Sequence, residues 1–186
     1  MEALSNSVRN NLRQTNWYVI TGGPGSGKTT TLNLLKERGY ITTFEHARHY
    51  LDTQRLKGRT IEDVRKQQRE FQLGVLDMQI EQEGQISPDV QVFLDRAIPD
   101  ALAYYRFLNL PEDEKLTEAL RTVSYKKVFI LDCLPLMKDY ARTEDEAASK
   151  KIHALLVEVY QSLGFPIIQV PVLPPDERVD FILKNL

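Results

Sequence analysis

One short stretch constrains the fold of this chain more than any other. Residues 22–29 read G-G-P-G-S-G-K-T, which fits the pattern G-x-x-x-x-G-K-[ST]. The apolar, β-branched run W-Y-V-I-T precedes it at 17–21, and leucines at helical spacing follow it at 32 and 35. A strand, a glycine-rich turn and a helix in this order form a P-loop, in which backbone N–H groups and the helix N-terminus surround phosphate groups. The sequence therefore predicts a phosphate-binding loop at 22–29.

Within this loop we assign separate roles to the backbone and to two side chains. Backbone N–H groups are expected to hold the phosphates of ATP or another nucleoside triphosphate, while the Lys28 ammonium adds a catalytic charge near the β- and γ-phosphates. The Thr29 hydroxyl is expected to bind Mg²⁺. The alternative is a glycine-rich turn with a surface lysine, although a chance match in this context is rare. The expected nucleotide-binding residues are Gly22, Gly23, Pro24, Gly25, Ser26, Gly27, Lys28 and Thr29.

Short apolar runs alternate with helical patterns along the rest of the chain. Strands are predicted at 17–21, 40–44, 90–94, 127–131 and 166–170. Helices are predicted at 29–38, 45–54, 60–82, 99–108, 112–122 and 144–163, and a final helix follows Pro175. Strands that are apolar throughout are typical of parallel sheets covered on both faces. The sequence therefore predicts an α/β fold of three layers around a five-stranded parallel sheet.

The stretch 60–82 has the longest helical periodicity. Thr60 and Asp63 form a helix-capping pattern, with an aspartate where glutamate or glutamine is usual. Steps of three and four predict that one face of this helix is formed by Ile61, Val64, Gln68, Phe71, Val75 and Met78.

Length and composition indicate a single domain. The chain has 186 residues, and we expect a flexible polar segment at 1–16 and one nucleotide-binding domain at 17–186. The net charge of −2 gives no reason to expect binding to nucleic acid or to a membrane surface. The single cysteine, Cys133, and the lack of an apolar leader predict a cytoplasmic protein.

Three predicted strands end at a carboxylate, namely Glu45, Asp95 and Asp132. Ligands of open α/β sheets bind beyond the carboxyl ends of the strands, so these residues are site candidates. We favour Asp95 as a catalytic ligand of Mg²⁺ and Arg96 as a catalytic bridge between a donor phosphate and an acceptor. The alternative for this pair is a surface ion pair. Asp132 is a second candidate metal ligand, on a strand expected to lie farther from the P-loop.

Two further candidates lie on the segments that follow these strands. Glu45 is suited to act as a general base on an acceptor hydroxyl, with Arg48 one turn away to orient it; a carboxylate that caps the next helix is an equal alternative. The stretch K-D-Y-A-R at 138–142 is suited to be a lid in which Arg142 stabilises the transferring group. A charged segment that leads into a helix is the equal alternative there.

Several longer stretches carry a family resemblance. They are G-G-P-G-S-G-K-T-T at 22–30, E-H-A-R-H-Y-L at 45–51, V-F-L-D-R-A-I-P-D-A-L-A-Y-Y at 92–105, V-F-I-L-D-C-L-P-L at 128–136 and P-V-L-P-P-D-E-R-V-D-F-I-L at 171–183. With them the chain resembles a family of small predicted ATPases and kinases with an AAA-type P-loop domain. The ribosylnicotinamide-kinase domain of bifunctional NAD regulators and the deoxynucleoside kinases are similar.

The resemblance implies the fold of nucleoside and nucleotide kinases. It implies that Glu45 is the base, that Asp95 and Arg96 contact metal and phosphate, and that Arg142 is the lid arginine. It also adds Thr30 to the nucleotide-binding loop and places the adenine against residues 172–175. One departure is Cys133, where the family often has proline.

Three functions remain in competition. The first is a kinase that transfers the γ-phosphoryl group of ATP to a small nucleoside- or nucleotide-like acceptor with Mg²⁺. The second is an ATP- or GTP-binding NTPase or switch that acts through a protein partner. It is disfavoured because no N-K-x-D motif is present and because Arg96 and Cys133 stand where a hydrolase often has glutamate. The third is a nucleotide-binding scaffold without turnover.

Overall fold

The computed structural model describes residues 14–134 and 146–186, apart from the side chain of Arg65. Most of the segment at 1–16 that we expect to be flexible lies outside the described residues, as does the lid segment 138–142 with Arg142. No helix in the two described ranges is both long enough and apolar enough to cross a lipid bilayer.

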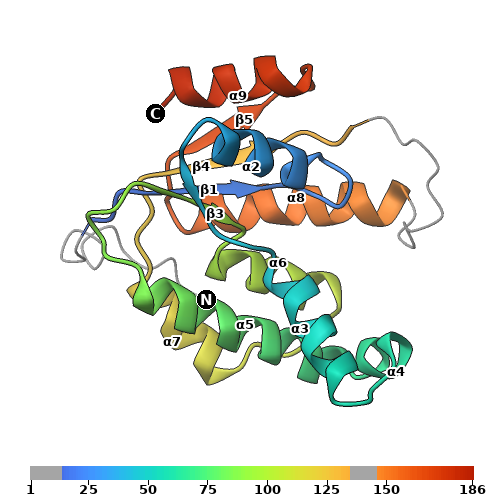
Figure 1. The fold of residues 1–186 in the computed structure, drawn as a ribbon. Coiled ribbons are helices and arrows are strands. Elements are labelled where there is room, and N and C mark those ends of the chain that lie inside the picture. Colours follow the sequence, from blue (N-terminus) through green and yellow to red (C-terminus); the bar gives the residue numbers. More distant parts are fainter. Residues whose placement is uncertain (1–13, 135–145) are drawn as a thin grey trace.

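Five parallel strands form one sheet through the molecule (Figure 1). The strands are β1 (Trp17–Thr21), β2 (Ile41–Thr42), β3 (Val92–Asp95), β4 (Lys127–Leu131) and β5 (Ile167–Val170). Their order across the sheet is β2-β3-β1-β4-β5. This confirms the predicted five-stranded parallel sheet. It also corrects one expectation, because β4 pairs directly with β1, as β3 does, and so the strand before Asp132 is not the more distant one.

Helices cover both faces of the sheet. They are α2 (Lys28–Glu37), α3 (His46–Leu56), α4 (Ile61–Lys66), α5 (Gln68–Gln85), α6 (Ile98–Phe107), α7 (Glu114–Thr122), α8 (Glu146–Ser162) and α9 (Pro175–Lys184). Figure 1 shows α9 on one side of the sheet and α6 on the other, with α3, α4, α5 and α7 gathered on the α6 side.

The alternating side chains of β1 contribute to two separate hydrophobic cores. Trp17 and Val19 pack into a cluster with residues of α6, α7 and α8. Tyr18 and Ile20 pack into a second cluster with residues of α2 and α9. Every side chain of β1 is therefore buried, which explains why the strand is apolar throughout rather than alternating with polar residues.

The predicted long helix at 60–82 is wrong in one respect, because it is divided at Gln67 into α4 and α5. The expected cap is confirmed: the Thr60 hydroxyl accepts a hydrogen bond from the Asp63 amide at 3.1 Å. Of the residues on the predicted face only Val64 is buried, whereas the buried residues of α5 are Gln72, Leu76, Gln79 and Glu83.

Tertiary contacts explain which face of α5 is buried. Both carboxylate oxygens of Glu83 are used inside the protein: Oε2 accepts from the Tyr125 hydroxyl at 2.8 Å and Oε1 from the Ile98 amide at 3.3 Å. Near the start of α5, Phe71 packs edge-on against the Tyr50 ring, with ring centroids 5.6 Å apart. A Cβ atom at Gly74 would overlap the same ring, so the glycine lets α3 approach α5 closely.

Candidate active site

The P-loop connects β1 to α2 and needs glycine at defined positions. Gly25 and Gly27 have positive φ angles of 75° and 84°, which side chains rarely adopt. A Cβ atom on Gly22 would lie 2.6 Å from the carbonyl oxygen of Leu131. The glycines therefore serve both the curvature of the loop and its close approach to β4.

Lys28 lies inside this loop. Its Nζ atom donates to the carbonyl oxygens of Gly22 and Gly23 at 2.9 and 3.0 Å and to the Ser26 hydroxyl at 3.2 Å. Burial lowers the pKa of Lys28 to about 7, and the nearby charge of Arg96 acts in the same direction. The ammonium is thus held at the place where a P-loop receives phosphate oxygens, and a triphosphate would favour its charged form.

Two helices far along the chain support the P-loop. From α8, Ser149 donates its hydroxyl to the Pro24 carbonyl at 2.7 Å. From α9, the buried Arg178 donates to the carbonyls of Ser26 and Leu173 at 3.1 and 3.0 Å. Burial also lowers the pKa of Arg178. Sequence reasoning did not single out Ser149 or Arg178 because their loop partners are distant in sequence.

A cavity of about 480 Å³ lies beside the start of α2. It brings together three of the predicted site residues, namely Thr29, Glu45 and Asp95. Residues from α2, from the end of β2 and from α3 complete its wall: Leu32, Asn33, Lys36, Thr42, Thr43, Phe44, Arg48, His49 and Asp52. The cavity is thus formed where the carboxyl ends of β2 and β3 meet the helix that starts at the P-loop, as expected for ligand sites of this architecture.

Asp95 and Thr29 fit a magnesium ion. Asp95 is 6% exposed, and its Oδ1 atom is buried without a hydrogen-bond partner among the described residues. The Thr29 side chain is exposed and lines the same cavity. Mg²⁺ is bound by oxygen ligands and takes one or two carboxylates together with phosphates and waters. Burial raises the pKa of Asp95 to about 6, although nearby Arg96 opposes the shift.

Glu45 is the residue that precedes α3, but its side chain makes no capping hydrogen bond. It instead forms an ion pair with Arg48, with 3.8 Å between Oε2 and Nε. The pair joins the two residues that the sequence places one turn apart. A carboxylate that faces the cavity and is not engaged in capping is available to accept a proton.

Arg96 adopts a backbone conformation that is rare outside glycine, with φ of 65°. Its amide donates to the Ile20 carbonyl at 3.1 Å, which ties the turn after β3 to β1. Its Nη1 atom donates to Asp100 at 2.9 Å, and its guanidinium lies over the Tyr104 ring, 5.3 Å from the centroid. The ion pair with Asp100 is buried, and so is Asp95, so Asp95 and Arg96 do not form the surface ion pair considered as the alternative.

The exit of β4 differs from the exits of β2 and β3. Asp132 does not line the cavity but lies 3.8 Å from the imidazole of His153, measured from Oδ1 to Nε2. Burial lowers the pKa of His153, against the effect of Asp132. Cys133 lies next to the P-loop, and its sulfur is 4.0 Å from the Ser149 hydroxyl.

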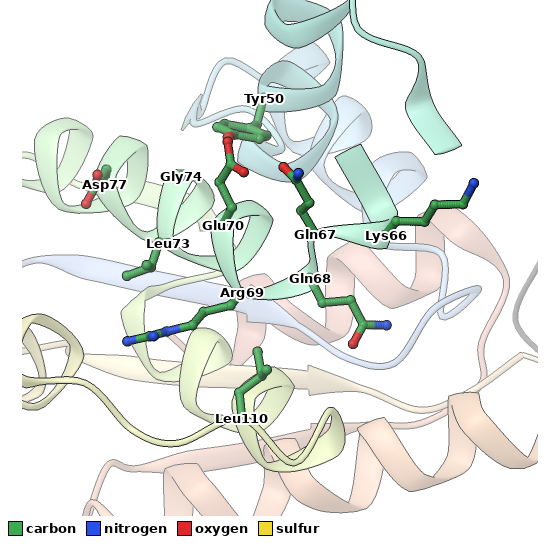
Figure 2. A pocket seen from close by; sticks show the side chains of 10 residues that line it. All are labelled: Tyr50, Lys66, Gln67, Gln68, Arg69, Glu70, Leu73, Gly74, Asp77 and Leu110. Atoms are coloured by element: carbon green, nitrogen blue, oxygen red, sulfur yellow. The ribbon is translucent and has the colours of Figure 1, made fainter. Parts of the chain in front are cut away.

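A second, larger groove lies away from the P-loop. It has a volume of about 980 Å³ and lies between α3, the α4–α5 junction and Leu110. Figure 2 shows Tyr50 and Glu70 on one side of it and Arg69 and Leu110 on another. None of its lining residues belongs to the P-loop or to a strand end, so the groove is separate from the phosphate site.

Comparisons with known structures place the fold. The chain is similar to deoxyadenosine kinase from M. mycoides with bound dATP, with a TM-score of 0.60 and 18% identity over 91% of this chain and 98% of that one. It is also similar to thymidylate kinase from Ehrlichia chaffeensis, with a TM-score of 0.63 and 16% identity over 93% and 98% of the two chains. The NadR protein in complex with NR gives a TM-score of 0.62 and 16% identity over 91% of this chain, which spans only 51% of NadR. The chain therefore has the fold of nucleoside and nucleotide kinases.

The family assignment comes from the sequence itself. No curated protein matches the chain significantly. A family model described as an AAA domain matches residues 17–178, which include the P-loop, the cavity residues and Arg178. This confirms the resemblance expected from the motifs: the chain belongs to this AAA domain family.

Proposed function

We propose that this chain is a small-molecule kinase that transfers the γ-phosphoryl group of ATP to a hydroxyl or phosphate of a nucleoside- or nucleotide-like acceptor. The observation that carries the proposal is the cavity that joins Thr29, Asp95 and Glu45 beside the P-loop. It brings together two oxygen ligands suited to Mg²⁺, a carboxylate that caps no helix and the last residue of the P-loop motif. These are the groups that phosphoryl transfer requires, since catalysis depends on positioning and on offsetting charge.

In the proposed reaction the residues of the chain bind, orient and move one proton. Loop amides and Lys28 hold the β- and γ-phosphates, while Thr29 and Asp95 would hold Mg²⁺. That ion, when bound, neutralises charge on the phosphate oxygens. Glu45 accepts the proton of the acceptor group. The acceptor oxygen bonds to the γ-phosphorus while the bond from phosphorus to the β–γ bridging oxygen breaks, and ADP leaves with that oxygen. Arg96 and Arg142 offset charge on the phosphoryl group in transit.

The acceptor assignment rests on two arguments. The similar solved structures include a deoxyadenosine kinase and a thymidylate kinase, whose acceptors are a nucleoside and a nucleotide. In this chain the connection between β2 and β3 is the longest between two strands that follow each other in the sequence, and we propose that its helices shape the acceptor side.

The proposal is tested by ATP consumption with Mg²⁺, first alone and then with a panel of nucleosides, nucleotides and nicotinamide riboside. A kinase is expected to show a low basal rate that rises with one acceptor and yields a phosphorylated product in the mass spectrum. Steady hydrolysis that no acceptor changes would instead support an NTPase or a switch.

A further inference from the structure

The most heavily bonded carboxylate near the site is Asp100, which lies in the first turn of α6. It is 2% exposed and accepts four hydrogen bonds. Oδ1 accepts from the Thr21 hydroxyl at 2.5 Å and from Arg96 Nη1 at 2.9 Å. Oδ2 accepts from the Ala97 amide at 3.2 Å and from the Tyr160 hydroxyl at 2.6 Å. A carboxylate has about four acceptor positions, so Asp100 is saturated by these donors.

The donors come from the elements that carry the phosphate machinery. Thr21 is the last residue of β1, directly before the P-loop, and Arg96 directly follows Asp95 at the end of β3. Tyr160 comes from α8, the helix whose Ser149 bonds to the P-loop. One buried negative charge therefore fixes the base of the P-loop and the turn after β3 relative to each other.

The arrangement constrains Arg96 more than an ordinary ion pair would. Its backbone is held by Ile20, its guanidinium lies over Tyr104, and Nη1 is bonded to a carboxylate that cannot turn without breaking three other bonds. A guanidinium has five N–H donors in a rigid fork. Because Nη1 donates to Asp100, the directions of the other N–H groups of the Arg96 guanidinium are also fixed. Arg96 directly follows Asp95, which lines the cavity beside the P-loop, and its amide bonds to β1 one residue before Thr21.

We propose that Asp100 is a positioning residue that holds Arg96 in the orientation in which it contacts the γ-phosphate. This inference rests on the proposed function only in assigning Arg96 to that phosphate. A competing explanation is that Asp100 serves stability alone, by capping α6 and bonding to Tyr160. The two explanations differ in what Asp100→Asn does to a property that depends on Arg96.

The test is the ratio of ATP affinity to ADP affinity, measured by calorimetry with Mg²⁺ for the wild type, Arg96→Ala, Asp100→Asn and the double variant. This ratio isolates the γ-phosphate and needs no acceptor, so it is independent of whether the chain turns out to be a kinase. Loss of a charge-assisted hydrogen bond is expected to lower the ratio about tenfold or more in each single variant. The double variant is expected to lose little more than either single one, because both changes remove the same contact.

Tyr160→Phe is the matched control, because it removes a hydroxyl bond from the same carboxylate without touching Arg96. It is expected to lower the melting temperature and to leave the ratio unchanged. The proposal is overturned if Arg96→Ala leaves the ratio unchanged, if the two losses add in the double variant, or if Tyr160→Phe lowers the ratio as much as Asp100→Asn. Should Asp100→Asn not fold, Thr21→Val replaces it, since Thr21 shares Oδ1 with Arg96. Thr21→Val must then lower the ratio more than Tyr160→Phe does, and an equal or smaller effect overturns the proposal.

Discussion

Lys28 is the residue whose removal is expected to reduce nucleotide turnover most directly. It is buried in the loop, where its Nζ atom bonds to two loop carbonyls and to Ser26. Lys28→Ala removes a preorganised charge, so turnover is expected to fall by about 100-fold or more while the fold is kept. Steady-state kinetics and circular dichroism check this, with Lys150→Ala in an exposed ion pair on α8 as the control. Near-normal turnover in Lys28→Ala would remove the central role of the loop.

Substitution of Glu45 is expected to change the rate of phosphoryl transfer rather than the affinity for ATP. Glu45→Gln keeps the shape of the side chain but cannot accept a proton, so transfer is expected to slow by about 100-fold or more with ATP affinity little changed. Single-turnover kinetics with calorimetry separate the two effects. Glu62→Gln, in an exposed ion pair with Lys66, is the control. A variant that transfers at the normal rate but binds ATP poorly would contradict the role of Glu45 as base.

The affinity for Mg²⁺ is expected to depend on pH through Asp95. Its pKa is raised by burial to about 6, so the carboxylate form that binds Mg²⁺ is lost as the pH falls through about 6 and is regained above it. Mg²⁺ affinity is therefore expected to rise with pH through this value, and Mg²⁺ is expected to shift the transition to lower pH. Calorimetry between pH 5 and pH 8 checks the affinity, and the shift of the transition is expected to be on the order of one pH unit. The expectation fails if Asp95→Asn shows the same profile.

At the scale of elements, the turn from the P-loop into α2 depends on one glycine. Gly27 has a φ of 84°, and a Cβ atom there would overlap the guanidinium of Arg178. Gly27→Ala is expected to reduce the free energy of unfolding by more than about 1 kcal/mol and to weaken ATP binding. Gly39→Ala is a matched control, because Gly39 has a similar φ of 89° with no heavy atom within 4 Å of a Cβ. The account is wrong if both variants unfold alike and bind ATP alike.

The three central strands, β1, β3 and β4, could be predicted from the sequence because they are buried almost throughout. Each residue of β1 is buried on one face or the other, so an unbroken apolar run identifies the strand. The inward face of α5 could not be predicted, because Gln79 and Glu83 are buried and Phe71 is only partly so. Periodicity assumes that the apolar face points inward, whereas here Tyr125 and Ile98, which bond to Glu83, orient the helix.

Some residues of the candidate site could likewise be predicted from the sequence and others could not. Thr29, Glu45 and Asp95 could be predicted because strand ends and a loop motif are visible in the sequence, and they line one cavity. Asp100 and Arg178 could not, although both stand in stretches that carry the family resemblance. Their partners are Thr21, Tyr160 and the Ser26 carbonyl, which only the folded chain brings near.

At the scale of the whole molecule, the sheet order explains why the site forms where it does. With β1 in the middle, the P-loop lies between the exits of β3 and β4. The exit of β3 leads to the cavity with Asp95, and the exit of β4 leads to Asp132 and His153. The same order places α8 and α9 against the loop, through Ser149 and Arg178.

The most direct test of the kinase proposal follows the γ-phosphoryl group itself. ATP that carries a heavy oxygen isotope on the γ-phosphate is incubated with the protein, Mg²⁺ and the acceptor that most stimulates turnover, and all products are identified by mass spectrometry. The account predicts that the label appears on the phosphorylated acceptor and that Asp95→Asn abolishes this product. Label found solely in inorganic phosphate, at a rate that no acceptor changes, would contradict the account and identify the chain as a hydrolase.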